Sequence, residues 1–254
     1  MPKLFVSTML YAASKKLGYS FAARELMRQV QAADLSNDEE PGMPVSHTIA
    51  HASGLEEAQV HVTAGATIIG LARSTAACDF LASEADVWLA CDDDVRVSAD
   101  AIAAAVSQAR AEPCLVIVPC LQRNTVATSV LAPTVNIVRG AVAVQDRAPS
   151  GGKIETVDAG GFGCYAVSRE VVQWVFDDAG EANDFTTSDG RLCRRVISDY
   201  VTGRQWCAED IGFCRRIAPK FRRWAVRCGT SLHAGQRLDL ETLEALVRSG
   251  ERAS

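Results

Sequence analysis

Short apolar runs alternate with segments of helical periodicity over the first two thirds of the chain. The strand-like runs lie at Leu4–Leu10, 45–53, 86–91 and 114–121, and the helix-like segments at Ser20–Ala33, 66–83 and 99–110. Most of the strand-like runs are apolar throughout, which is typical of strands that are buried on both faces. The alternation predicts an α/β fold with a mostly parallel central sheet flanked by helices.

Residues that favour helix ends support this division. Ser20 and Ser98 precede two of the helical segments and are suited to cap them, and Pro113 stops the segment that Ser98 begins. The polar stretch NDEEPGMP at 37–44 is rich in helix breakers, so we expect a loop there.

The last third has a different pattern. The Gly-rich stretch 150–168 predicts strands and turns, and 169–176 predicts a short helix. We expect a mobile polar loop at 177–190, an amphipathic helix at 208–218, and a strand that runs into a loop at 224–235. No stretch has the composition of a linker, so we expect a single domain over residues 1–254.

Composition limits the class of protein. Of the 254 residues, 48% are hydrophobic and 22% are charged, which excludes disordered, collagen-like and coiled-coil chains. The net charge of −5 shows that the chain as a whole is not a polycation. No apolar run reaches the length that spans a bilayer, about 18 to 20 residues, and the start of the chain resembles a first strand rather than a signal peptide. We therefore expect a cytoplasmic protein without a membrane span.

The nine cysteines have neither CxxC nor zinc-finger spacing, and their number is odd. Most of them stand in apolar runs such as EPCLVIVPC. We expect buried free thiols in a reducing compartment.

Three adjacent aspartates, Asp92, Asp93 and Asp94, follow the strand-like run DVWLAC. Their charges repel one another, and at the carboxyl edge of a parallel sheet they would face the crevice where ligands bind. A divalent cation that prefers oxygen ligands would relieve this repulsion and would also take substrate phosphates. The alternative is a solvated turn, since aspartate is common after strands.

Three later segments also carry candidate chemistry. Glycines at 160, 161 and 163 would let a ligand approach the backbone closely, although such a cluster is more often only a turn. Glu209 and Asp210 open the amphipathic helix, where one of them could act as a general base or both could be ordinary first-turn acids. His233 follows a strand, as a metal ligand or as a structural residue. The chain has neither a GxGxxG dinucleotide motif nor a P-loop.

In combination, these four segments resemble the metal-dependent nucleotide-sugar glycosyltransferases of the GT-A fold. LACDDDV resembles the DxD motif, and DAGGFGCYAVSREV resembles the glycine loop with the short helix after it. WCAEDIGFCRRI resembles the xED helix in its family-2 form, and TSLHAG resembles the C-terminal metal-binding histidine. The resemblance covers roughly the stretch from Leu4 to Gly235.

The resemblance implies a Rossmann-like nucleotide-sugar half at about 1–125 and an acceptor half at about 126–240. It implies Mn²⁺ or Mg²⁺ held by Asp92, Asp94 and His233, and an inverting transfer in which Asp210 is the base and Glu209 orients the acceptor. It favours a UDP-sugar donor, with donor contacts from Thr8, Tyr11, Arg73, Asp92, Asp93 and Gly161. Gly160 would lie close to the acceptor, and Trp206 could stack on its ring.

The chain departs from the family pattern at three places. The acidic pair that usually ends the second strand and helps to read the uracil base is replaced by HTIAHAS. The usual ARN reads Ala72-Arg73-Ser74, which retains the arginine, and the loop STMLY lacks the usual Pro-x-Tyr-Asn.

The stretch from Thr186 to Arg237 is basic. It has eleven Lys and Arg against four Asp and Glu, a net of +7 in a chain whose total is −5. This favours an anionic acceptor contacted by residues such as Arg194 and Arg195, for example DNA that carries a hydroxymethylated base, an anionic saccharide or a lipid phosphate. The alternative is a set of solvated arginines.

Two other functions fit parts of the pattern. A sugar-phosphate nucleotidyltransferase would share the α/β sheet and the metal carboxylates, but STMLYAASKKLG has only one glycine where such an enzyme needs a Gly-rich loop. A nucleic-acid-binding module with a degenerate site is the non-enzymatic alternative, although the acids and His233 are all present.

Overall fold

The computed structural model describes residues 4–10, 49–50, 58–64, 69–92, 95–120, 137–138, 153–187, 190–202, 205–233 and 236–239. Several predictions lie outside these residues: the helix at Ser20–Ala33, the loop at 37–44, and the candidate site residues Tyr11, Asp93 and Asp94.

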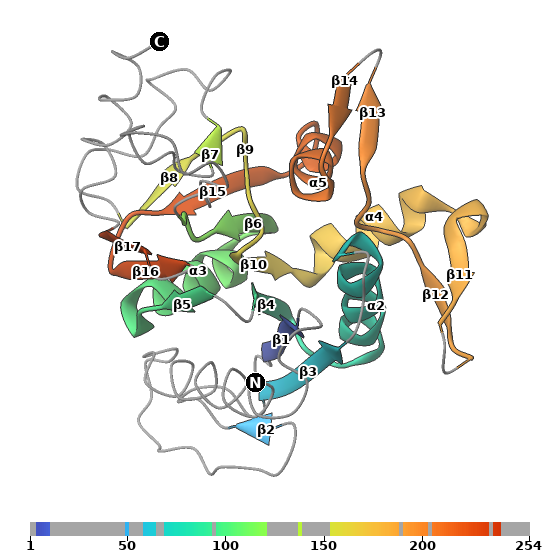
Figure 1. Ribbon diagram of the computed structural model, residues 1–254, viewed down its shortest axis with the longest axis horizontal. Coiled ribbons are helices and arrows are strands. Elements are labelled where there is room, and N and C mark those ends of the chain that lie inside the picture. Colours follow the sequence, from blue (N-terminus) through green and yellow to red (C-terminus); the bar gives the residue numbers. More distant parts are fainter. Residues whose placement is uncertain are drawn as a thin grey trace.

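An eight-stranded sheet forms the centre of the structure (Figure 1). In spatial order its strands are β2 (Ile49–Ala50), β3 (Ala58–Ala64), β1 (Leu4–Leu10), β4 (Val87–Asp92), β10 (Cys164–Ser168), β6 (Cys114–Ile117), β15 (Arg222–Val226) and β8 (Ile154–Thr156). Strands from both halves of the sequence therefore belong to one sheet.

The sheet is mixed, and five of its eight strands run in the same direction. Strand β1 is parallel to β3 and β4, and β15 is parallel to β6. Strand β10 runs antiparallel to both of its neighbours, β4 and β6, and the outer strands β2 and β8 are also antiparallel to theirs. The α/β class is confirmed, and the antiparallel strands are the part of the sheet that the alternation of elements did not predict.

Helices cover both faces of the sheet, as expected for strands buried on two sides. Helix α3 (Ala99–Ala111) lies on one face, and α2 (Ile69–Ala82), α4 (Arg169–Ala179) and α5 (Glu209–Ile217) lie on the other (Figure 1). Alternate strand residues serve the two cores: Leu4 and Val6 pack with α3, whereas Phe5 packs with α2.

The strand predicted at 45–53 is described only in part: β2 lies within this range, and the other residues of the range lie outside the described residues. Within that range the structure describes only β2, which is two residues long, and the long strand beside β1 is β3. The sequence of β3, AQVHVTA, alternates polar and apolar residues, so it lacks the continuous apolar run that marks β1 and β4. The parallel partner of β1 is therefore a strand that periodicity did not predict.

The polar stretch 177–190 is more ordered than expected from its composition. After a 3₁₀ turn at Glu181–Asn183, β11 (Asp184–Thr186) pairs with β12 (Leu192–Arg194) as an antiparallel hairpin. A second hairpin, β13 (Tyr200–Thr202) with β14 (Gln205–Cys207), leads directly into α5. Both hairpins extend away from the central sheet (Figure 1).

The segment at 224–235, predicted as a strand that runs into a loop, contains parts of two strands in different sheets. Strand β15 belongs to the central sheet, and β16 (Thr230–His233) lies between β5 (Val95–Val97) and β17 (Gln236–Asp239). Gly229, with φ 77°, makes the turn between β15 and β16. A side chain there would collide with the hydroxyl of Ser98. A further pair, β7 (Ile137–Val138) and β9 (Ala159–Gly160), stands apart from these sheets.

Ser98 directly precedes α3, as predicted, but its side chain does not cap the helix. Its hydroxyl accepts a hydrogen bond from the Thr230 N–H, at 2.9 Å, and so joins α3 to β16. Helix α3 ends at Ala111, and Glu112, just before Pro113, has extended backbone, as expected before a proline.

All nine cysteines are free, and seven of them are buried. Burial raises the pKa of Cys78 to about 11 and that of Cys214 to about 12, so both thiols are protonated near neutral pH. The prediction of buried free thiols is confirmed. Among the described residues, no helix has both the length and the apolar character needed to cross a bilayer.

Candidate functional site

The carboxyl ends of β1 and β4 lie side by side. These strands are parallel, with Thr8 opposite Cys91 and Met9 opposite Asp92, so Asp92 stands at the edge where ligands bind in α/β sheets. The Asp92 N–H donates to the carbonyl of Gly163, at 2.8 Å. The aspartate segment and the glycine segment are therefore joined through their backbones at this edge.

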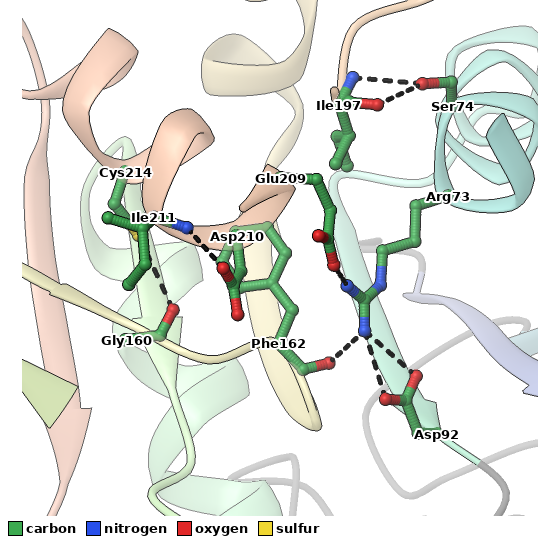
Figure 2. A network of polar contacts seen from close by, with 10 residues as sticks. All are labelled: Arg73, Ser74, Asp92, Gly160, Phe162, Ile197, Glu209, Asp210, Ile211 and Cys214. Carbon is green, nitrogen blue, oxygen red and sulfur yellow. Dashed lines mark hydrogen bonds and ion pairs between the residues drawn. The ribbon is translucent and has the colours of Figure 1, made fainter. Parts of the chain in front are cut away.

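Arg73 of α2 connects three of the segments singled out by their sequence (Figure 2). Its Nη2 donates to both carboxylate oxygens of Asp92, at 3.1 and 3.2 Å, and to the carbonyl of Phe162, at 3.0 Å. Its Nη1 donates to Oε1 of Glu209, at 2.5 Å. The Arg73 side chain is only 3% exposed, so a buried guanidinium lies between two carboxylates.

Aromatic rings enclose this charged cluster. The guanidinium carbon lies 5.6 Å from the centre of the Phe162 ring, and that ring packs on Tyr165 at 4.4 Å and on Phe213 of α5 at 5.6 Å. Water is largely excluded, so attraction between Arg73 and the two acids is stronger than at the surface, while loss of either acid is more costly.

Glu209 and Asp210, the predicted acidic pair, occupy the first turn of α5 but have different surroundings. Glu209 turns toward Arg73, and its side chain is 12% exposed. Asp210 accepts a hydrogen bond on Oδ1 from the N–H of Ile211, at 2.6 Å. Among the described residues this is the only hydrogen bond to the Asp210 carboxylate, so Oδ2 remains available to another group.

Burial raises the pKa of Glu209, and the charges of Asp210 and Asp199 act in the same direction. The positive charge of Arg73 opposes this shift but does not cancel it. Glu209 therefore takes up a proton at a higher pH than an ordinary glutamate does.

Helix α2 also holds the chain segment that leads to α5. The Ser74 hydroxyl donates to the carbonyl of Ile197 and accepts from its N–H, both at 3.0 Å. Gly70, one turn earlier, packs so closely that a Cβ atom there would lie 3.0 Å from the Ile197 oxygen. At the other side of α5, the Cys214 thiol lies 3.9 Å from the carbonyl of Gly160. These contacts fix α5 relative to α2 and β9.

His233 comes close in the fold to the aspartate segment. Its backbone pairs with Val95 in the β16–β5 ladder, and Val95 is the next residue after Asp94 in the chain. Within the described part of the chain no group of three His, Cys, Asp or Glu side chains could hold a metal ion. The predicted ligand Asp94 lies outside that part.

The remaining predicted site residues are only partly brought together. Gly160 ends β9, and Gly161 lies between it and Phe162, next to the cluster. Trp206 lies on β14, three residues before Glu209, and is 65% exposed. Thr8 lies near the carboxyl end of β1.

The two predicted acceptor arginines lie on the β11–β12 side of α2 and not in the Arg73 cluster. Arg194 pairs with Asp184, at 2.6 Å, and its guanidinium carbon lies 4.4 Å from the ring centre of Phe176. Arg195 donates to the side-chain oxygen of Asn183, at 3.3 Å. Arg194 is thus occupied by contacts that stabilise its own hairpin.

Several acids outside Thr186–Arg237 neutralise cations of this basic stretch. They pair with five of its eleven cations, as Asp79–Arg191, Asp184–Arg194, Asp178–Arg216, Glu112–Arg222 and Glu155–Arg227. When these five acids are included, the net of +7 falls to +2. The linear count therefore overstated the positive charge near α5.

Three groups that contribute to the site were not predicted from the sequence. The carbonyl of Phe162 and the backbone of Ile197 leave no sequence signal, because any residue supplies these groups. Ser74 had been noted only as a departure from the ARN pattern, and its small hydroxyl is what fits between α2 and Ile197.

No protein-family model and no curated protein matches this chain. Among solved structures, A197 from STIV is similar to it, with a TM-score of 0.51 over 94% of this chain and 91% of that one. The two sequences are 11% identical, so the similarity concerns the fold alone.

Proposed function

We propose that this protein is a glycosyltransferase that moves a sugar from a nucleotide-sugar donor to an acceptor hydroxyl. The observation that carries the proposal is the Arg73 cluster, which joins the aspartate segment at Asp92, the glycine segment at Phe162 and the acidic pair at Glu209. These segments are far apart in sequence, and each was a candidate for the same chemistry. Their meeting at the carboxyl edge of the sheet supports one shared site.

Asp210 is the general base in this proposal. Its carboxylate has one oxygen held by the Ile211 N–H, which orients the group, and the second oxygen can accept the proton of an acceptor hydroxyl. The deprotonated hydroxyl attacks the anomeric carbon from the face opposite the leaving diphosphate. A single displacement of this kind inverts the configuration.

A divalent cation fits the residues at the aspartate segment only in part. Both oxygens of Asp92 already accept hydrogen bonds from Arg73, which favours a contact of Asp92 with the donor sugar or ribose over a role as metal ligand. Asp94 and His233 supply an oxygen and a nitrogen donor and would hold Mn²⁺ or Mg²⁺. Such a cation supplies positive charge that stabilises a leaving diphosphate.

The remaining parts of the site bind and orient. The glycine backbone at Gly160 and Gly161 leaves room for the donor sugar and the acceptor beside Phe162. The exposed ring of Trp206 offers a flat surface on which an acceptor ring can stack. We favour a UDP-sugar as donor and an anionic acceptor such as hydroxymethylated DNA, and the net charge of +2 indicates few phosphate contacts.

Incubation with a panel of sugar nucleotides, with manganese or with EDTA, tests the proposal. We expect release of the nucleoside diphosphate, its loss in EDTA, and its loss in Asp210→Asn. Release of inorganic diphosphate would instead indicate a sugar-phosphate nucleotidyltransferase. Absence of turnover, together with nucleic-acid binding that survives EDTA, would indicate a binding module.

A further inference from the structure

Among the contacts of the described residues, Arg73 is the one side chain that contacts both Asp92, at the strand edge, and Glu209, on helix α5. Asp92 ends β4, which belongs to the sheet, whereas Glu209 begins a helix that packs on β9 and on the β13–β14 hairpin. The guanidinium therefore joins these two acids directly, in addition to the Ser74–Ile197 and Cys214–Gly160 contacts that hold α5.

We propose that Arg73 is a positioning residue, which holds Asp92 and the first turn of α5 in one fixed relation, and that Glu209 is its counter-ion rather than an acceptor contact. The role of Asp92 in donor binding and that of the first turn of α5 in catalysis rest on the proposed function. The link between the two acids does not.

The geometry supports separate roles for the two acids of the pair. Glu209 is used by Arg73, with its side chain 12% exposed, whereas Asp210 keeps one oxygen without a partner among the described residues. Adjacent positions in the first turn of a helix point in different directions, so one acid faces inward and the other is left for the reaction. Glu209 then acts through Arg73, by keeping the base on α5 at a set distance from Asp92.

The guanidinium is suited to this role, and an ammonium is not. Its planar fork reaches Asp92, Glu209 and the Phe162 carbonyl at once from a buried position. The lysine side chain carries a single point charge and cannot span the three acceptors. Arg73→Lys is therefore expected to weaken the link although the charge is kept.

The first test measures unfolding and needs no substrate. Urea denaturation is followed for Asp92→Asn, Glu209→Gln and the double variant, in the wild-type and the Arg73→Met background. With Arg73 present, each single variant leaves one carboxylate on the buried guanidinium, whereas the double variant leaves none of the described carboxylates. We expect the double variant to lose more stability than the sum of the two single variants, and this excess to vanish in Arg73→Met.

Additive losses in the wild-type background would overturn the proposal, because they would show that Asp92 and Glu209 do not share Arg73. Should Arg73→Met fail to fold, the three variants that retain Arg73 still decide the question. Glu155→Gln is the control, since Glu155 is a buried carboxylate, its side chain 3% exposed, that pairs with Arg227 and not with Arg73 in the pairs that the structure shows. Combined with Asp92→Asn it should give additive losses.

The second test separates a positioning role from direct contact with substrate. Glu209→Gln keeps an oxygen that accepts from Arg73, whereas Glu209→Ala does not. We expect turnover of Glu209→Gln to stay within about tenfold of wild type, and that of Glu209→Ala to fall by about a hundredfold, as misplaced groups do. For the base, Asp210→Asn and Asp210→Ala should be equally impaired. Equal losses in Glu209→Gln and Glu209→Ala would contradict the role given to Glu209.

The two tests distinguish failure of this inference from failure of the proposed function. A protein without sugar transfer can still show the non-additive unfolding, in which case the link stands and the function falls. An active transferase with additive unfolding would keep the function and remove the link.

Discussion

The Ser74 hydroxyl holds both backbone groups of Ile197, as donor to its carbonyl and acceptor from its N–H, at 3.0 Å each. Ile197 lies between the two hairpins, in the segment that leads to α5. This contact and the Arg73–Glu209 pair come from adjacent residues of α2, so one turn of a helix fixes both the start of α5 and the chain that precedes it.

Loss of the Ser74 hydroxyl should therefore destabilise the fold. Ser74→Ala leaves a buried N–H and a buried carbonyl without their partner, which costs about 1–3 kcal/mol for such groups. Urea denaturation measures this loss. Thr75→Ala is the matched control, since its hydroxyl donates only to the Leu71 carbonyl within the same helix, and we expect little change. A Ser74→Ala protein as stable as Thr75→Ala would show that the Ile197 contact contributes nothing.

Asp210 should carry the base function. Asp210→Asn preserves the shape of the side chain and its acceptor oxygen for Ile211 but cannot take up the proton, so turnover should fall by about 10² to 10⁴-fold. Donor affinity should change little, because the proposed donor site is at the strand edge and not at Asp210. Proton NMR of the new linkage should show inversion relative to the donor. A retained configuration would exclude the single displacement even if Asp210 proved essential.

Much of this arrangement follows from local sequence. The apolar runs of β1, β4 and β6 and the helices α2, α3, α4 and α5 lie where periodicity placed them. Asp92 and Glu209 were also candidates because acids at a strand end and at a helix start have a local physical reason.

The antiparallel placement of β10 and the contacts of Arg73 could not be predicted in this way. Strand β10 is as apolar as a parallel strand would be, since it too is buried on both faces, so its composition does not reveal its direction. Arg73 was expected to contact the donor because Ala72-Arg73-Ser74 resembles the ARN pattern, and a lone arginine has no local signal for a partner 136 positions away. Such pairings depend on the packing of whole elements, which sequence periodicity does not encode.

The acidity of Glu209 should leave a signature in the pH dependence of stability. Burial raises its pKa above the 4.5 of an ordinary glutamate, with Asp210 and Asp199 adding to the shift and Arg73 opposing it. Between 4.5 and the raised value the unfolded chain has released this proton and the native protein still holds it, so the free energy of unfolding falls as the pH rises through that window. Glu209→Gln should remove this slope.

Asp184 provides a control of opposite sign. The hydrogen bonds and charge of Arg194 hold the pKa of Asp184 below the usual 3.8. The stability that this pair contributes is therefore present above pH 3.8 and is lost as the pH falls through the lowered pKa. For each variant, the difference in unfolding free energy from wild type is measured as a function of pH. This difference should change with pH in the window above pH 4.5 for Glu209→Gln, and only below about pH 4 for Asp184→Asn. A flat difference curve for Glu209→Gln would contradict the shift.

Manganese should stabilise the protein through His233. A ligand that binds only the native state adds about 2.7 kcal/mol at a hundred times its Kd, which a thermal-shift measurement detects without any turnover. We expect the shift in wild type and its loss in Asp94→Ala and in His233→Ala. Asp100→Asn, an exposed acid in the first turn of α3, should keep it. An unchanged shift in His233→Ala, or full activity in EDTA, would remove the metal assignment.

The charge around α5 sets the salt dependence that a polyanionic acceptor should show. For duplex DNA the logarithm of affinity falls with the logarithm of salt by about 0.9 for each phosphate contact. Two contacts, the number that the net charge of +2 suggests, predict a fall of about tenfold between 50 and 200 mM salt. Six or more contacts, as the linear count of +7 would have allowed, predict about a thousandfold or more.

The acceptor Michaelis constant, measured across that salt range with hydroxymethylated DNA, decides between these cases. We expect it to rise by about tenfold while the donor constant changes much less, because a deeply bound diphosphate is screened less than surface charges. Arg195→Glu should weaken binding of the acceptor without altering hydrolysis of the donor. The reason is that, in the hydrogen bond that the structure shows, the Arg195 guanidinium contacts the neutral Asn183 and not a carboxylate. A Michaelis constant that stays flat would exclude an extended anion. The acceptor would then be a neutral saccharide or small molecule that stacks on Trp206, and the paired arginines would serve only to hold the hairpin and the helices together.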